Sequence, residues 1–377
     1  MPEKHQSFAL QWRAVRNRIL RNPLFYRLAM GSTIGRFFAR RSARKLFDLT
    51  AGFIYSQVLA GGVRSGLFEH LAGGPMSVAE VAAAIDLPDD ATRRLLAAST
   101  SLGLLDKLPD ARFMLGAQGA ALLANPGVAA MVLHHDALYQ DLADPLKALR
   151  KRGGGELAKL WDYASDDGKP AAGDATPETE RYTRLMAASQ DLVASETLRV
   201  FDVSPYRRIL DIGGGSGRFL THVAARNGHA ELHLLDRPSV ATLARETLAG
   251  RDDASRFIVH GGDFLTSEFP VGCDLITLVR ILHDHDDDVV EALLRKVHAA
   301  LRPVRGRLLV TEPMADERAR SRIGDAYFNI YLHAMGSGRP RTPTELVELL
   351  HAIGFRRVRR LPTGMPIATS ALCADAH

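Results

Sequence analysis

The chain has 377 residues, of which 46% are hydrophobic and 24% charged, a composition typical of a globular protein long enough for two domains. Its two cysteines, Cys273 and Cys373, lie in apolar, strand-like segments. This excludes a disulfide framework or a cysteine-based metal site as the organising feature and favours a reducing cytoplasm.

The net charge of +5 is unevenly distributed along the chain. Residues 1–45 hold eleven Lys or Arg and one acid, Glu3, a balance of +10, which leaves 37 basic and 42 acidic residues, a balance of −5, in the rest. A mildly acidic body argues against a nucleic-acid partner. No cleavable signal sequence is expected, since the first 30 residues lack a continuous apolar core.

The basic arm at residues 1–45 interleaves apolar residues with its cations. Trp12, Val15 and Ile19 share one helical face, and arginines crowd the other side. This pattern fits an amphipathic segment lying on an anionic membrane, which would place a cytoplasmic protein at the inner membrane surface. It fits equally well an arm that covers a partner subunit. The apolar stretch 46–63 contains Asp48 and Gln57, and we expect a buried helix there, not a membrane span.

Residues 46–150 predict a compact, mainly α-helical lobe that resembles a winged helix. Ser77 and Glu80 form a capping box, Asp89 or Asp90 caps a second helix, and segments 104–106 and 113–115 can pair as a wing. Arg93 and Arg94 would lie on a DNA-recognition helix, but acidic residues crowd its start. A dimerisation role, with a two-fold homodimer through about residues 46–145, is therefore favoured over DNA binding.

Residues 151–204 predict a linker followed by substrate-side helices. Glycines and aspartates interrupt residues 150–177, and Thr176 and Pro177 then open a long helix that runs through Val200. Met186 and Gln190 fall on one side of this helix with Tyr182. They form either ordinary packing or one wall of a substrate site.

Residues 205–377 alternate strands and helices, which predicts an α/β domain with a doubly wound, mostly parallel seven-stranded sheet. The expected strands are 208–212, 231–236, 256–260, 273–279, 306–312, 355–361 and 367–374. A ligand then binds beyond the carboxyl ends of the strands.

A glycine-rich turn follows the first of these strands. Asp211, Gly213, Gly215 and Gly217 stand there, and Arg218 occupies the position where a dinucleotide fingerprint needs its third glycine. The turn therefore resembles the first motif of class I S-adenosylmethionine-dependent methyltransferases. The second strand ends in Asp236, 25 residues after Asp211, where an acid can accept the ribose hydroxyls.

Two later strand ends carry further chemistry. Asp263 and Phe264 follow the third strand, where a carboxylate and an aromatic ring can bind adenine. His283 follows the fourth strand, where an imidazole can act as a general base or simply be a hydrogen-bonded structural residue. His283, His285 and the acids at 286–288 could also suggest a metal site, but the acids are better explained as a helix start, and we predict no metal.

Together these motifs, with Thr311-Glu312-Pro313 and Arg341-Thr342, look like the O-methyltransferase family that includes caffeate and acetylserotonin methyltransferases. The resemblance covers about residues 46–374. It implies that Gly213 and Gly215 approach the methionine part of S-adenosylmethionine, that Asp211 and Arg280 belong to the same cofactor site, and that Glu312 orients the base His283 beside Asp284. The family's second orienting glutamate falls at Pro340, which leaves the base less constrained.

Within that family the chain is most similar to carotenoid hydroxyl O-methyltransferases of purple bacteria, of the hydroxyneurosporene and demethylspheroidene type. Segments 47–57, 324–331 and 336–342 and the basic arm carry this resemblance. It implies methylation of a hydrophobic alcohol, the tertiary 1-hydroxyl of an acyclic carotenoid, in a pocket lined by Met186, Tyr327, Tyr331 and Met335. The alternatives are a phenol or bacteriochlorophyllide-carbon methyltransferase and an S-adenosylmethionine-sensing winged-helix regulator.

Overall fold

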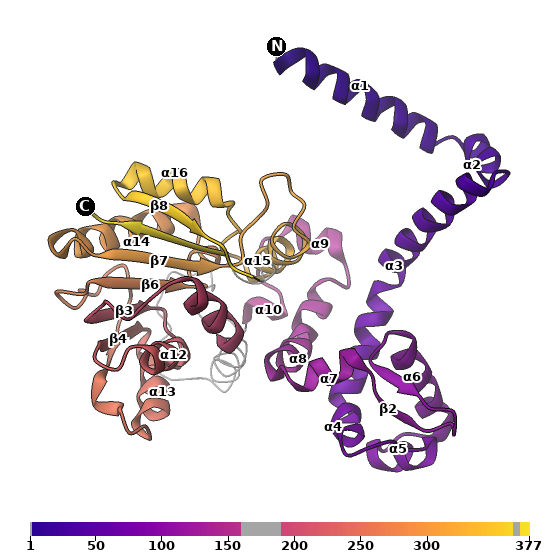
Figure 1. Ribbon diagram of the computed structural model, residues 1–377, viewed down its shortest axis with the longest axis horizontal. Coiled ribbons are helices and arrows are strands. Elements are labelled where there is room, and N and C mark those ends of the chain that lie inside the picture. The colour runs from indigo at the N-terminus through magenta and orange to yellow at the C-terminus, as the bar shows by residue number, and fades with distance from the viewer. Residues whose placement is uncertain (1, 160–189, 365–369) are drawn as a thin grey trace. The chain divides into compact units, whose positions relative to one another are not determined.

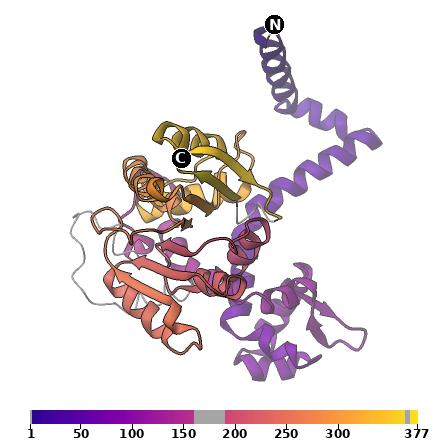
Figure 2. The same cartoon turned by 60° about the vertical axis from the view of Figure 1, so that its left-hand side comes forward.

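The computed structural model describes residues 2–159, 190–364 and 370–377, which fall into two compact units, residues 1–120 and 121–377. Figures 1 and 2 show the helices of the first unit and the sheet of the second. The predicted lobe 46–150 crosses this boundary. Its last helices belong to the second unit because Leu138 packs in the same apolar cluster as Leu157 and Tyr331.

The first unit begins with three helices and continues into a small helical lobe with a two-stranded wing. Its elements are α1 (Pro2–Leu20), α2 (Pro23–Met30), α3 (Thr33–Arg64), α4 (Leu67–Ala72), α5 (Val78–Ile85), α6 (Asp89–Ser101), β1 (Leu105–Lys107), β2 (Phe113–Leu115) and the start of α7 (Ala117–Leu123). The Ser77–Glu80 capping box and the antiparallel β1–β2 wing confirm two sequence predictions. The N-cap of α6 is Pro88, however, and Asp89 and Asp90 lie in the first turn of that helix.

Helix α3 departs from the expectation of a buried helix. Within one chain Leu46, Leu49 and Phe53 are 64%, 75% and 67% exposed, whereas Ala60 and Gly62 are buried. The reason is length: this 32-residue helix extends beyond the small lobe that its last turns pack against. Among the described residues it is also the one helix long and apolar enough to cross a membrane, judged by length and composition alone.

The second unit contains a seven-stranded sheet, with helices on both of its faces (Figure 1). Its strand order is β5-β4-β3-β6-β7-β9-β8, with β9 antiparallel to both neighbours and the other neighbouring pairs parallel. The strands are β3 (Arg208–Ile212), β4 (Glu231–Asp236), β5 (Phe257–Gly261), β6 (Leu275–Val279), β7 (Arg307–Glu312), β8 (Arg356–Leu361) and β9 (Ser370–Asp375). This confirms the predicted doubly wound sheet; residues 367–369 of the last predicted strand lie outside the described residues.

Alternation along the strands separates two apolar cores. Leu210 and Ile212 face a core shared with α14 (Asp287–Leu301) and α16 (Pro343–Ile353). Ile209 faces a core shared with α12 (Arg218–Arg226), α13 (Pro238–Ala249) and the helical residues 190–200. The helices of this unit are α8 (Pro126–Asp141), α9 (Pro145–Arg150), α10 (Glu156–Lys159), α12 (Arg218–Arg226), α13 (Pro238–Ala249), η1 (Ala254–Arg256), η2 (Leu282–Asp284), α14 (Asp287–Leu301), η3 (Arg302–Val304), the π-helix η4 (Arg322–Phe328), α15 (Asn329–Met335) and α16 (Pro343–Ile353). The start of the predicted helix at Thr176 lies outside the described residues.

Candidate active site

The glycine turn between β3 and α12 leaves open space at the carboxyl end of the sheet. Gly213 and Gly215 have φ values of +69° and +57°, which side chains with a Cβ rarely adopt. A Cβ added at Gly213 would collide with Ile281, whereas a Cβ at Gly215 would meet no atom within 4 Å. The Gly213 N–H donates to the Leu235 carbonyl at 2.8 Å, which ties the turn to β4. The space beside Gly215 is therefore available to a ligand.

The carboxylate of Asp236 fixes this turn from the neighbouring strand. Its two oxygens accept hydrogen bonds, both 2.8 Å long, from the backbone N–H groups of Gly215 and Arg237. Burial raises the pKa of Asp236, and these two hydrogen bonds oppose the rise. The structure thus gives the predicted ribose-binding acid a second role, which is to hold the glycine turn.

Asp211 is a buried acid with one unused oxygen. Its Oδ1 accepts a hydrogen bond from the Thr277 hydroxyl at 2.5 Å, while Oδ2 has no hydrogen-bond partner in the described part of the chain. Burial raises the pKa of Asp211 to about 7, with a further contribution from the charge of Asp236. An orphaned, buried carboxylate oxygen beside the turn fits a ligand that carries a positive charge or a hydrogen-bond donor.

The loop after β5 positions the pair predicted to bind adenine. Asp263 Oδ1 accepts hydrogen bonds from the N–H groups of Leu265 and Thr266 at 2.7 and 3.2 Å. The Phe264 ring packs edge-on against His285, with centroids 5.1 Å apart. The Asp263 carboxylate therefore stabilises the backbone of its own loop. The Phe264 ring packs this loop against the segment that carries His283.

Arg280 lies at the end of β6 in a left-handed conformation, with φ +60°. Its backbone N–H donates to the Thr311 carbonyl at 2.7 Å. Burial raises the pKa of Tyr327, and the positive charge of Arg280 lowers it. Arg280 is therefore close enough to Tyr327 for its charge to act on that hydroxyl, and its predicted cofactor role stays a prediction.

His283 is buried in η2, directly after β6. Its Nε2 lies 3.1 Å from Asp284 Oδ1, and its backbone N–H donates to Glu312 Oε2 at 3.1 Å. Its Nδ1 and Glu312 Oε1 have no hydrogen-bond partner among the described residues. Glu312 thus holds the backbone of His283, and Asp284 is the carboxylate within 3.1 Å of the ring. The role of Glu312 in orienting the base stays a prediction.

Arg341 fixes the segment on both sides of His283. This arginine is only 2% exposed and donates to the carbonyls of Leu282 and His285 at 2.7 and 2.9 Å. It also contacts Asp287, the first residue of α14. The buried charge of Arg341 therefore binds backbone carbonyls. This gives the arginine of the Arg341-Thr342 motif a structural role.

An aromatic cluster lies next to the His283 ring. Phe328 is 5.5 Å from that ring between centroids, and the rings of Tyr327 and Tyr331 stack 5.7 Å apart. Two histidines of α8 occupy the tyrosine hydroxyls: His135 Nε2 lies 2.7 Å from Tyr327 Oη, and His134 Nε2 lies 2.8 Å from Tyr331 Oη. Both histidines were missed in the sequence. Each lies nearly 200 residues from its tyrosine, a separation of 192 residues for His135 and 197 for His134, and no local pattern links residues so far apart.

The remaining predicted substrate residues differ in their placement. Met335, only 1% exposed, is packed in the cluster that contains Leu138 and Leu157, which gives it a core role. Gln190 is half-buried at the start of the described helix 190–200, and Met186 lies outside the described residues. Within the described ranges no three His, Cys, Asp or Glu side chains gather as a metal site. Cys273 and Cys373 are buried free thiols.

Comparison with known proteins places this arrangement in context. Residues 139–356 match the model of the O-methyltransferase domain, and residues 47–125 match the O-methyltransferase dimerisation domain. The chain is 42% identical to the demethylspheroidene O-methyltransferase of Cereibacter sphaeroides over 336 residues, covering 89% of this chain and 87% of that protein. It is 30% identical to the acetylserotonin O-methyltransferase of Mus musculus, covering 86% and 87% of the two chains.

A solved structure shows the same likeness in three dimensions. The crystal structure of human N-acetylserotonin methyltransferase in complex with S-adenosylmethionine superposes with a TM-score of 0.75 at 25% identity. The match covers 89% of this chain and 97% of that one. The similarity therefore extends across both units and is not confined to the sheet.

Proposed function

Because this chain belongs to the S-adenosylmethionine-dependent O-methyltransferase family, we propose that it methylates the tertiary 1-hydroxyl of an acyclic carotenoid, with His283 as general base. The observation that carries the acceptor assignment is the 42% identity, over most of both chains, to a protein named demethylspheroidene O-methyltransferase. The observation that carries the base is the burial of His283 beside a carboxylate at the carboxyl edge of the sheet.

The residues at the glycine turn fit the methyl donor. S-adenosylmethionine, when bound, supplies a methyl group made electrophilic by the adjacent sulfonium. Asp211 Oδ2, unpartnered in the described structure, offers a buried negative acceptor to its cationic end. Gly215 leaves open space for the ligand. In this proposal Asp236 binds the ribose, and Asp263 with Phe264 binds the adenine.

The residues around His283 fit proton removal from a hydroxyl. An alcohol is a far weaker acid than an imidazolium ion, so its proton must leave as the oxygen attacks, and a base held at a fixed place is effective in that step. Glu312 and Arg341 hold the backbone around His283. Asp284, 3.1 Å from Nε2, stabilises the positive charge that the ring acquires.

The aromatic cluster fits a hydrophobic acceptor. The hydroxyls of Tyr331 and Tyr327 are hydrogen-bonded to His134 and His135. The two tyrosines would therefore contact an acceptor mainly through their rings, beside Phe328. Burial raises the pKa of the Tyr327 hydroxyl, which therefore stays protonated and leaves His283 as the base. Apolar ring faces next to a buried imidazole suit an alcohol at the end of a hydrocarbon chain.

The dimerisation domain at 47–125 supports a homodimer, and the exposed apolar face of α3 is part of that region. We also propose that the enzyme is cytoplasmic and works at the inner membrane surface, since a carotenoid alcohol resides in the bilayer.

The decisive experiment incubates the purified enzyme with methyl-labelled S-adenosylmethionine and, in separate reactions, an acyclic carotenoid tertiary alcohol, a phenolic acceptor and a bacteriochlorophyllide. Labelled methyl ether formed from the carotenoid alcohol, and lost with His283→Ala, is the expected result. Label on the phenol or on a macrocycle carbon instead would replace the proposed acceptor. No transfer to any acceptor, together with tight binding to duplex DNA, would favour a regulator.

A further inference from the structure

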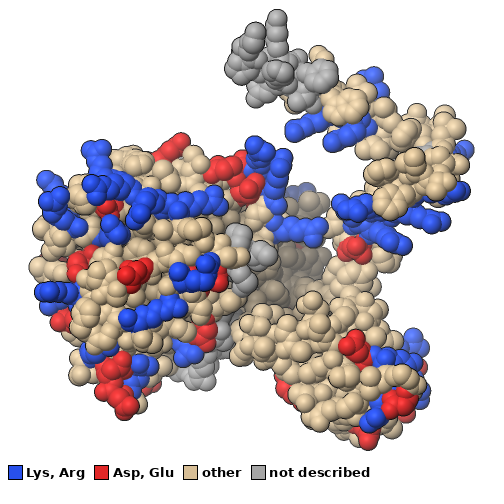
Figure 3. All heavy atoms as spheres, in the orientation of Figure 1, with Lys and Arg blue, Asp and Glu red and all other residues tan. Residues whose placement is uncertain are grey.

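The arm formed by α1, α2 and the first turns of α3 exposes apolar and basic side chains together. Trp12 is 63% exposed, Leu28 77% and Phe37 63%. The other exposed large apolar residues of this segment are Leu10, Val15, Ile19, Leu20, Leu24, Phe25, Ile34 and Phe38. Figure 3 shows blue cationic side chains beside tan surface along these helices. The arm therefore presents much more apolar surface than a solvated charged tail does.

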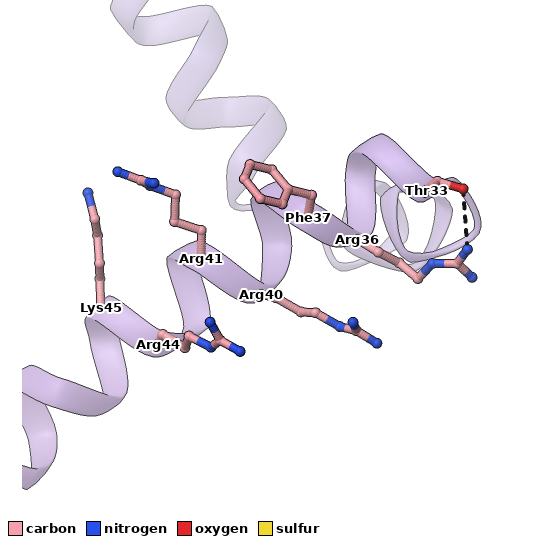
Figure 4. Close-up of a pocket in the computed structure, with 7 residues that line it drawn as sticks. All are labelled: Thr33, Arg36, Phe37, Arg40, Arg41, Arg44 and Lys45. Atoms are coloured by element: carbon pink, nitrogen blue, oxygen red, sulfur yellow. Dashed lines mark hydrogen bonds between the residues drawn. The ribbon is translucent and has the colours of Figure 1, made fainter. Parts of the chain in front are cut away.

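The start of α3 gathers five cations around an open groove. Arg36, Arg40 and Arg44 follow one another at four-residue spacing, and Arg41 and Lys45 continue the row that begins at Phe37 (Figure 4). Thr33 completes the lining, and its hydroxyl accepts a 3.5 Å hydrogen bond from Arg36. We call these seven residues, Thr33, Arg36, Phe37, Arg40, Arg41, Arg44 and Lys45, the cation groove.

The cation groove lacks an internal counter-charge. No ion pair within the described part of the chain includes any of its five cations, and Glu3 is the only acid before Asp48. Five like charges on three turns of one helix repel one another, which destabilises the helix unless anions bind there. A bound external anion would therefore stabilise this segment.

The arm also precedes the region that the family shares. The match to the dimerisation domain begins at residue 47, after the last residue of the groove. The exposed apolar residues Phe47, Leu49 and Phe53 fall inside that domain, where the partner subunit of a dimer would cover them. The apolar residues of the arm lie outside the matched range, so the match assigns them no such role.

We infer that the arm is a docking surface for an anionic lipid bilayer. Headgroup phosphates would occupy the cation groove, and the apolar side chains of α1, α2 and α3 would enter the interfacial region. A nucleic acid or an acidic protein tail could neutralise the cations, but neither would cover so many exposed large apolar side chains. Arginines between Arg36 and Arg44 keep the helix at the interface, since charges are costly at the bilayer centre.

The inference rests on the proposed function in one respect: the docking surface would bring the active site to an acceptor that stays in the membrane. Binding to lipid is a separate physical property of the arm. The two can therefore be tested separately.

The binding test measures co-sedimentation of the full-length enzyme with phosphatidylcholine vesicles that contain or lack phosphatidylglycerol, at low and high salt. The test variant carries Arg40→Gln, Arg41→Gln, Arg44→Gln and Lys45→Gln. The matched control removes four exposed arginines of β8 through Arg356→Gln, Arg357→Gln, Arg359→Gln and Arg360→Gln. We expect binding that requires the anionic lipid, falls with salt, and weakens roughly a hundredfold or more in the groove variant, from the usual contribution of each cation.

Four results would overturn the inference: equal binding by the groove variant and the wild type, an equal loss in the β8 control, tighter binding to duplex DNA than to vesicles, or resistance of the bound protein to alkaline carbonate, which would indicate a spanning helix. A Phe37→Ser, Phe38→Ser variant tests the apolar component and should lose the binding that remains at high salt.

The activity test separates the inference from the proposed function. The groove variant should lose activity on a vesicle-embedded tertiary alcohol and retain it on a short, soluble analogue. If the wild type binds anionic vesicles but methylates neither alcohol, the proposed function fails while the docking surface stands. If the groove variant loses activity on both alcohols while remaining folded by circular dichroism, the arm belongs to the fold or the dimer and the inference fails.

Discussion

Asp284 Oδ1 lies 3.1 Å from Nε2 of its neighbour His283 and is the carboxylate next to the proposed base. At the position of the family's second orienting glutamate this chain has Pro340, and Glu312 is engaged with the backbone N–H of His283. A protonated ring would therefore be stabilised by Asp284, and the charge of Glu312 also acts on it. The ring is buried, lies next to Phe328 and belongs to a segment whose backbone carbonyls Arg341 holds.

The first prediction concerns this pair. His283→Ala should lower kcat by roughly 10²–10⁴, the usual contribution of general acid–base help, and Asp284→Asn by a smaller factor. Neither change removes a group at the glycine turn, so S-adenosylmethionine affinity measured by calorimetry should hold. A His283→Ala enzyme with wild-type kcat and lost cofactor affinity would show that the residue is structural.

Asp236→Ala should weaken S-adenosylmethionine binding by about 1–3 kcal/mol, because both the ribose contact and the hydrogen bond to the Gly215 N–H are lost. Asp236→Asn keeps an acceptor for that N–H and should retain more affinity than the alanine variant. Calorimetric titration of both variants separates the two roles. Unchanged affinity in the alanine variant would remove Asp236 from the cofactor site.

Asp211 should make stability depend on pH. Burial raises its pKa from the ordinary value of 3.8 to about 7, so the folded chain binds this proton more tightly than the unfolded chain. The group's contribution to the free energy of unfolding is then full below about pH 4 and is lost as pH rises through about 7. Denaturant titrations at pH 5 and pH 8 should differ less for Asp211→Asn than for the wild type. The variant keeps an acceptor for the Thr277 hydroxyl, so an equal difference would assign the effect to other buried acids.

Tyr327→Phe tests whether the aromatic cluster positions the acceptor without transferring a proton. The ring is kept, the bond to His135 Nε2 is lost, and the histidine is left without that partner. We expect kcat to stay within about threefold and KM for the acceptor to rise by up to about tenfold, the cost of one unsatisfied polar group. His135→Phe removes the same hydrogen bond and should change kcat and KM to a similar extent. A kcat loss as large as that of His283→Ala would instead make the tyrosine hydroxyl part of the chemistry.

Assembly can be tested through the exposed face of α3. Leu49 and Phe53 are 75% and 67% exposed in one chain and lie inside the dimerisation domain. Light scattering at micromolar concentration should show a dimer for the wild type and a monomer for Leu49→Glu, Phe53→Glu. A matched change outside the domain, Val271→Glu, replaces a side chain that is 87% exposed and should leave the dimer intact.

The strands and the glycine turn could be predicted from the sequence because both depend on local pattern. Apolar runs such as Leu275–Val279 and a turn whose positive φ values favour glycine are visible within a few residues. The His135–Tyr327 contact could not be predicted, since it joins a helix and a π-helix that are distant in sequence. The bond from the His283 backbone N–H to Glu312 could not be predicted either, because a carboxylate can accept from a ring or from a backbone N–H at the same sequence position.

Helix α3 runs without a break from Thr33 to Arg64, so one stiff rod carries the cation groove at its start and dimerisation residues at its end. A two-fold dimer then joins two grooves through continuous helix instead of through a flexible linker. Lipid binding becomes bivalent, and the second groove binds at a high effective concentration once the first is bound. The monomeric α3 variant should therefore lose far more than half of its vesicle affinity, although its own groove is unchanged.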